Sequence, residues 1–122
     1  RLGQMMAPTV ITNTTPAMKV NCEELFAPVV TVTPYREINE AFALVNQSPY
    51  GLQAGLFTRD MKVIFQAFDQ IEVGGLIIND VPTYRIDAMP YGGMKESGFG
   101  REGIRYAIAE MTELKLLALN VM

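Results

Sequence analysis

The chain of 122 residues contains no histidine and a single cysteine, Cys22. Without histidine, the sequence excludes serine–histidine–aspartate triads, cysteine–histidine pairs and histidine-ligated metal sites within this chain. One thiol cannot form an internal disulfide or a cysteine-only metal site, so we predict no metal centre. The low cysteine content indicates a reducing compartment, and we expect a cytoplasmic protein.

Basic residues are in the minority, and long apolar runs are missing. There are 10 Lys and Arg against 13 Asp and Glu, which gives a formal net charge of −3. This balance argues against a nucleic acid or an anionic membrane as partner. No apolar run approaches the ~20 residues of a membrane span, and no signal peptide opens the chain. Because the first residue is Arg1, we expect a piece of a longer protein or a processed product.

Short β-branched runs alternate with amphipathic helical patterns. Each expected helix repeats apolar residues at positions i, i+3, i+4 and i+7, as one face of an α-helix does. The last internal strand lacks alternation, which is typical of a parallel sheet covered on both faces. The order predicts an α/β fold with a mainly parallel sheet and flanking helices. We expect strands at 8–12, 29–33, 52–57, 76–78 and 115–121, and helices at 36–46, between a cap at Thr58 or Asp60 and Gly74, and at 101–113.

Four of the ten glycines fall within residues 90–102. Glycines this dense indicate positive φ angles or a close approach of another group to the backbone. The stretch ends a long loop, 79–100, between a strand and a helix, where α/β proteins place their sites. The glycine spacing fits neither a dinucleotide fingerprint nor a Walker loop. On glycine content alone, a tight connection without a ligand is an equal alternative.

Two acidic residues, Glu23 and Glu24, follow Cys22 directly. Adjacent anions disfavour a thiolate, so we interpret Cys22 as an ordinary thiol and not as a nucleophile. A carboxylate in this segment could accept hydrogen bonds from sugar hydroxyls. The alternative is a solvated acidic pair.

Arg85 lies in the long loop, together with Tyr84 and Asp87. An arginine on a site loop suits bidentate recognition of a carboxylate or phosphate. The alternative is a surface arginine paired with Asp87. Lys95, Arg101 and Glu102 are candidates for structural ion pairs at the start of the last helix.

Four segments resemble motifs of the aldehyde dehydrogenase superfamily, in the order of that family. Residues 24–29 are similar to Glu-x-Phe-Gly-Pro-Val, with Ala27 in place of the commoner glycine. Residues 46–58 are similar to Asn-x-x-x-Tyr-Gly-Leu-x-Ala-x-x-Phe-Thr, and 74–79 to Gly-x-x-x-x-Asn. Residues 90–102 resemble the signature Pro-Tyr-Gly-Gly-x-Lys-x-Ser-Gly-x-Gly-Arg-Glu, and a Thr-Glu-x-Lys motif follows at 112–115.

The resemblance implies the C-terminal part of an NAD- or NADP-dependent catalytic domain that oxidises a small aldehyde to a carboxylic acid or thioester. It implies that Glu24 holds the nicotinamide ribose hydroxyls, that Phe26 lies beside the nicotinamide, and that Tyr91 lines the substrate tunnel. Arg85 is our candidate for substrate binding, because it is an arginine on the long loop just before the signature. Residues 79–87 also resemble a branch of the family that acts on small, often charged aldehydes.

The family's nucleophilic cysteine, base glutamate and oxyanion asparagine lie upstream of these motifs. We therefore assign no catalytic residue to this chain and expect the chain alone to be inactive. We divide it into 1–113, the end of the catalytic domain, and 114–122, an oligomerisation strand, which implies a homo-oligomer, either dimer or tetramer. The rival interpretation is a non-catalytic α/β interaction or oligomerisation module.

Overall fold

The β-branched runs of the N-terminal third form a small parallel sheet. The structure, a computed structural model, describes residues 3–121. Strand β1 (Thr9–Thr12) pairs with β2 (Val29–Val32) in parallel, from Thr9 opposite Val29 to Thr12 opposite Val32. The connection between them contains α1 (Lys19–Cys22), a single helical turn that the sequence pattern did not predict.

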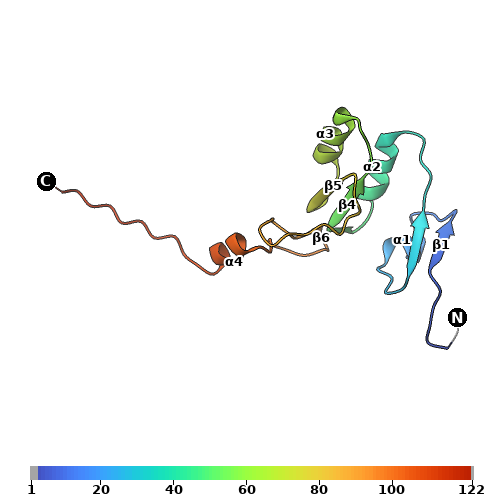
Figure 1. Ribbon diagram of the computed structural model, residues 1–122, viewed down its shortest axis with the longest axis horizontal. Coiled ribbons are helices and arrows are strands. Elements are labelled where there is room, and N and C mark those ends of the chain that lie inside the picture. The colour runs from blue at the N-terminus through green and yellow to red at the C-terminus, as the bar shows by residue number, and fades with distance from the viewer. Residues whose placement is uncertain (1–2, 122) are drawn as a thin grey trace.

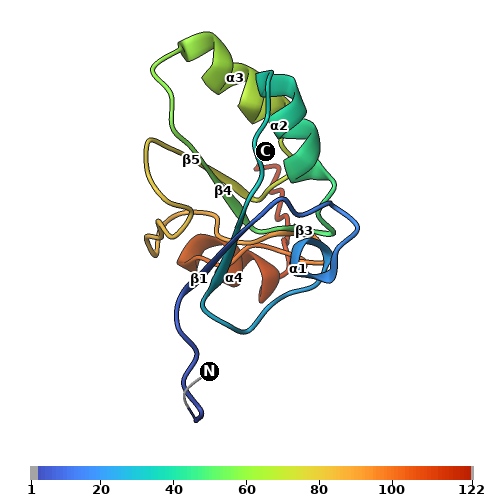
Figure 2. The ribbon, with the colours of Figure 1, turned by 90° about the vertical axis from the view of Figure 1, so that its right-hand side faces the viewer.

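A second parallel pair carries the two long helices. Strand β4 (Gln53–Leu56) pairs with β5 (Gly75–Ile78), and α3 (Met61–Gln70) connects them. The α3 helix begins at a cap on Asp60, whose carboxylate accepts a 2.8 Å hydrogen bond from the Lys62 amide. Helix α2 (Ile38–Asn46) lies beside α3 on the same side of this sheet (Figure 1, Figure 2).

The end of the long loop forms a third, antiparallel pair. Strand β6 (Met94–Lys95) runs against β3 (Tyr50–Gly51), so part of the expected loop 79–100 is a strand. The predicted α/β class with mainly parallel pairing is therefore confirmed, and the parallel strands are divided between two small sheets. Among the described residues the strands form three separate two-stranded sheets, two of them parallel.

The last expected elements differ from the structure. Helix α4 (Ile104–Glu110) begins three residues later than predicted, because Glu102 pairs its backbone with Tyr91 and Gly103 has a φ of 121°. The expected strand at 115–121 is not formed. This segment runs away from the other elements (Figure 1) and has no strand partner among the described residues; Met122 lies outside them. A strand exists only with a hydrogen-bonded neighbour, so apolar composition alone did not produce one.

The apolar core is very small. Of the described apolar side chains, only Phe42 on α2 and Ala67 on α3 are buried. Both belong to the predicted helix stripes, while Phe26 and Phe99 are almost fully exposed. A chain of this length normally buries well over half of its unfolded surface. The exposed apolar side chains therefore need further protein or a ligand to cover them.

Candidate functional site

Close backbone contacts explain the first two glycines of the signature at 90–102. A Cβ atom on Gly92 would lie 2.6 Å from the carbonyl oxygen of Gly100. A Cβ atom on Gly93 would lie 2.4 Å from the Cβ of Ser97. Gly98 and Gly100 instead have φ angles of 116° and 73°. Both expected reasons for the glycines are therefore present, at different positions.

Lys95 ties the signature to the end of α2. Its Nζ atom donates hydrogen bonds to the carbonyl oxygens of Asn46, at 2.8 Å, and Ser48, at 3.2 Å, and forms a 2.8 Å salt bridge with Glu72. Ser97 adds a second tie, since its hydroxyl accepts a 2.9 Å hydrogen bond from the amide of Gly51. The ion pair expected for Lys95 therefore exists, but its partner is not at the start of the last helix.

Arg101 binds carbonyl groups and makes no salt bridge with a described carboxylate. Its Nη1 atom donates to the carbonyl oxygens of Gly93, at 2.9 Å, and Gly100, at 2.7 Å. The guanidinium group thus holds the turn at 93–100 closed. The structural role expected for Arg101 is present, although it does not act through an ion pair.

Arg85, Tyr91 and Glu102 form a contact group, which we call the Arg85 cluster. The guanidinium carbon of Arg85 lies 4.4 Å from the centroid of the Tyr91 ring, a cation–π contact. Its Nη2 atom lies 2.7 Å from Oε2 of Glu102. The backbones of Tyr91 and Glu102 donate hydrogen bonds to each other, which brings the two side chains together. The partner of Arg85 is therefore Glu102, and the alternative pairing with Asp87 is wrong.

The Arg85 cluster lines a pocket of about 300 Å³. The salt bridge is open to solvent, with 51% of the Arg85 side chain and 64% of the Glu102 side chain exposed. The pocket thus combines a few polar groups with apolar lining residues and is accessible to solvent, as many small-molecule sites are. The other lining residues are Ile86, Asp87, Met89, Gly103, Ile104 and Ala107.

The other two predicted site residues, Glu24 and Phe26, lie in the segment between α1 and β2. Both are exposed, Phe26 to 94%. This segment and α4 lie on opposite sides of the β4–β5 sheet along the long axis (Figure 1). Among the described contacts, none joins Glu24 or Phe26 to the Arg85 cluster. The predicted residues therefore form two separate groups.

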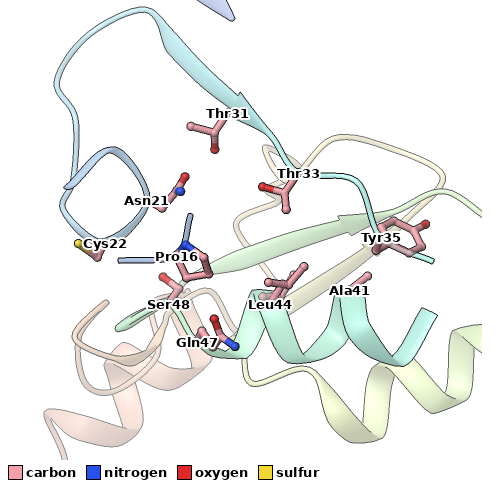
Figure 3. A pocket seen from close by; sticks show the side chains of 11 residues that line it. Pro16, Asn21, Cys22, Thr31, Thr33, Tyr35, Ala41, Leu44, Gln47 and Ser48 are labelled. Carbon is pink, nitrogen blue, oxygen red and sulfur yellow. The ribbon is translucent and has the colours of Figure 1, made fainter. Parts of the chain in front are cut away.

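A larger pocket of about 390 Å³ lies between α1, β2 and α2, as Figure 3 shows. Thr31, Thr33 and Tyr35 line it, and sequence patterns did not single them out. Cys22 stands at its edge, exposed, with its sulfur 3.4 Å from the carbonyl oxygen of Met18. That contact suits a thiol, which is a weak hydrogen-bond donor.

Residues 3–121 contain neither a cluster of potential metal ligands nor a helix that could span a membrane. No three cysteine, aspartate or glutamate side chains in this range come together as metal ligands could. None of the helices in this range is long and apolar enough to cross a membrane.

The chain is similar to known proteins along nearly its whole length. It is 52% identical over 121 residues to the 3-sulfolactaldehyde dehydrogenase of Priestia aryabhattai, covering 99% of the chain and 25% of that enzyme. It is 44% identical to the lactaldehyde dehydrogenase of Methanococcus aeolicus, covering 98% of the chain and 26% of that protein. The chain thus spans about a quarter of the length of these curated relatives.

The fold also matches solved structures. Aldehyde dehydrogenase 21 from Physcomitrella patens, in complex with its reaction product succinate, superposes with a TM-score of 0.88 at 45% identity, over 93% of this chain and 24% of that one. Other similar structures hold NAD⁺ or NADP. The sequence model of the aldehyde dehydrogenase family matches residues 1–117. This chain belongs to the aldehyde dehydrogenase family.

Proposed function

We propose that this chain supplies cofactor-binding and substrate-binding residues to an NAD- or NADP-dependent enzyme that oxidises a small aldehyde to a carboxylic acid. The single observation that carries the substrate half of this proposal is the Arg85 cluster, a guanidinium held against an aromatic ring at an open pocket. Family membership supports the reaction class.

Glu24 and Phe26 are our candidates for the cofactor half. A carboxylate accepts hydrogen bonds from the vicinal hydroxyls of a ribose, and an exposed aromatic ring can lie against a planar ring. Both side chains are exposed and therefore accessible to a ligand, and their chemistry fits a nicotinamide ribose group. When bound, that cofactor accepts the hydride.

The thiol and base that the reaction needs come, in this proposal, from outside the chain. The Cys22 thiol donates a hydrogen bond to the carbonyl oxygen of Met18, and acidic residues follow it in the sequence. We therefore propose that the chain alone is inactive. We also propose that the enzyme works in the cytoplasm and as a homo-oligomer.

The substrate we propose is an aldehyde that carries an anionic group. Arg85 and Tyr91 line the route by which this substrate reaches the active site. Two similar proteins are described with anionic compounds: one is named for sulfolactaldehyde, which has a sulfonate, and the other is in complex with its product succinate, which has two carboxylates. Lactaldehyde, named for another relative, is uncharged. The family therefore leaves the charge of the substrate open, and Arg85 is the residue that favours an anion.

Replacing Arg85 with alanine tests this assignment. In the enzyme that contains this chain, Arg85→Ala should lower kcat/KM for succinic semialdehyde about tenfold or more relative to butanal, because a charge-assisted hydrogen bond contributes about 1.5–3 kcal/mol. Steady-state kinetics with both aldehydes give the ratio. Arg105→Ala is the matched control, since Arg105 lies on α4 outside the residues that line the pocket. Equal losses for both aldehydes in Arg85→Ala would contradict a role in anion recognition.

A further inference from the structure

We infer that Glu102 is a specificity-determining residue. Its carboxylate forms a salt bridge with Arg85 and so limits how strongly the pocket attracts an anionic substrate. The inference rests on the proposed function, in which Arg85 meets the substrate. It assigns to Glu102 a role in choosing between substrates.

The geometry of the cluster leaves Arg85 only partly available. The Tyr91 ring contacts one face of the guanidinium group, and Glu102 accepts a hydrogen bond from Nη2. A guanidinium group has five N–H donors in a planar fork. A substrate anion must therefore use the remaining donors or displace Glu102. Displacement is feasible because the salt bridge is more than half exposed, and such pairs are weak.

The charged residues that line the pocket also support a limited attraction for anions. Among its lining residues Arg85 is the one cation, while Asp87 and Glu102 are two potential anions. The formal charge of the lining is thus one positive minus two negative, or −1. An arginine without acidic neighbours would attract any anion. Here the negative charges of Asp87 and Glu102 offset the positive charge of Arg85 and weaken its attraction for an anion. Glu102 should therefore disfavour strongly charged groups, such as a phosphate dianion, more than a monoanion.

The backbone of Glu102 is held in place beside Tyr91, although its carboxylate is exposed. Its amide donates to the carbonyl oxygen of Tyr91 and its carbonyl accepts from the Tyr91 amide, so the two residues move together. The next residue, Gly103, has a φ of 121°, and a Cβ atom on it would lie 2.7 Å from the carbonyl oxygen of Met89. The chain on both sides of the carboxylate is thus held by close contacts.

The test compares three aldehydes in the enzyme that contains this chain. These are butanal, which is neutral, succinic semialdehyde, a monoanion, and glyceraldehyde 3-phosphate, a dianion. The Glu102→Gln variant keeps an acceptor for Arg85 but removes the negative charge. We expect it to raise the kcat/KM of succinic semialdehyde relative to butanal about tenfold, since one like charge near the ligand has been removed. The gain for glyceraldehyde 3-phosphate should be larger.

Two further variants separate charge from shape. Glu102→Asp restores the negative charge and should return the ratio toward that of the unmodified enzyme. Glu110→Gln makes the same change of net charge on α4, outside the pocket lining, and should leave the ratio unchanged. A general loss of folding or activity lowers kcat/KM for all three aldehydes together and does not raise the ratio.

The outcomes distinguish this inference from the proposed function. If Arg85→Ala removes the preference for the anion while Glu102→Gln leaves it unchanged or lowers it, anion recognition by Arg85 stands and the role of Glu102 is refuted. If Arg85→Ala has no effect on the preference, both proposals are refuted. A ratio that rises in Glu102→Gln, and does not rise in the double variant with Arg85→Ala, supports both.

Discussion

Replacing Gly74 with alanine should destabilise the protein by about 3 kcal/mol or more, a large fraction of the stability of a typical domain. The new Cβ atom would lie 1.6 Å from the carbonyl oxygen of Gly92 and 3.1 Å from that of Leu52. Neither group can rotate away, since both are backbone. The strand β5 and the signature at 90–102 must therefore separate, which also displaces Tyr91. Urea unfolding followed by circular dichroism measures the change.

Gly75→Ala is the matched control, because Gly75 is adjacent and has no positive φ. The atoms nearest to its new Cβ atom would be those of the Gln53 side chain, at 3.3 Å, and that side chain is flexible. We expect a change within about 1 kcal/mol of zero. If Gly74→Ala unfolds at the same urea concentration as Gly75→Ala, the close approach of Gly74 to Gly92 does not exist in solution.

Deleting residues 115–122 should convert an oligomer into monomer or aggregate. The segment exposes Leu116 to 90%, Leu117 to 78%, Leu119 to 78% and Val121 to 89%. Its backbone makes no hydrogen bond among the described residues. Isolated proteins avoid exposing unpaired backbone groups together with apolar side chains. We therefore propose that another copy of the chain covers this segment. Pairing about a two-fold axis is the simplest arrangement, because closed dimers are the commonest assemblies.

Static light scattering of the intact and the shortened chain tests this proposal. The intact chain should be at least a dimer. A double substitution, Leu117→Asp with Leu119→Asp, keeps the length of the chain and should also disrupt the assembly, whereas Asn120→Asp should not. A stable monomer of the intact chain at high micromolar concentration would count against the role of this segment.

Local patterns predicted the local parts of this fold. The apolar stripe of 36–46 became α2 within two residues at its start, and the strands with β-branched residues were found where expected. The pairing of β3 with β6 could not be predicted from these patterns. Each strand is only two residues long, and 42 residues separate the end of β3 from the start of β6. The contacts of Lys95 and Ser97 that hold this pair depend on the folded chain.

In the candidate site, too, the sequence indicated single residues but not the contacts between them. Sequence similarity identified Arg85 and Tyr91 as separate residues, but nothing in the spacing indicated that they touch. Asp87 was the alternative partner of Arg85 because it lies two residues away, but closeness along the chain did not decide the pairing, and the 2.7 Å salt bridge of Arg85 is with Glu102. Glu102, 17 residues along the chain, is the partner because its backbone pairs with Tyr91.

Stopped-flow measurement of NADH or NADPH formation in the enzyme that contains this chain tests the assignment of Glu24 most directly. Glu24→Gln should slow hydride transfer at saturating cofactor about tenfold to a hundredfold, because a displaced nicotinamide no longer meets the substrate correctly. Glu23→Gln is the matched control, since Glu23 forms an exposed salt bridge with Lys19, at 3.2 Å, and should change the rate less than about twofold. A slow Glu23→Gln variant beside a normal Glu24→Gln variant would contradict the assignment.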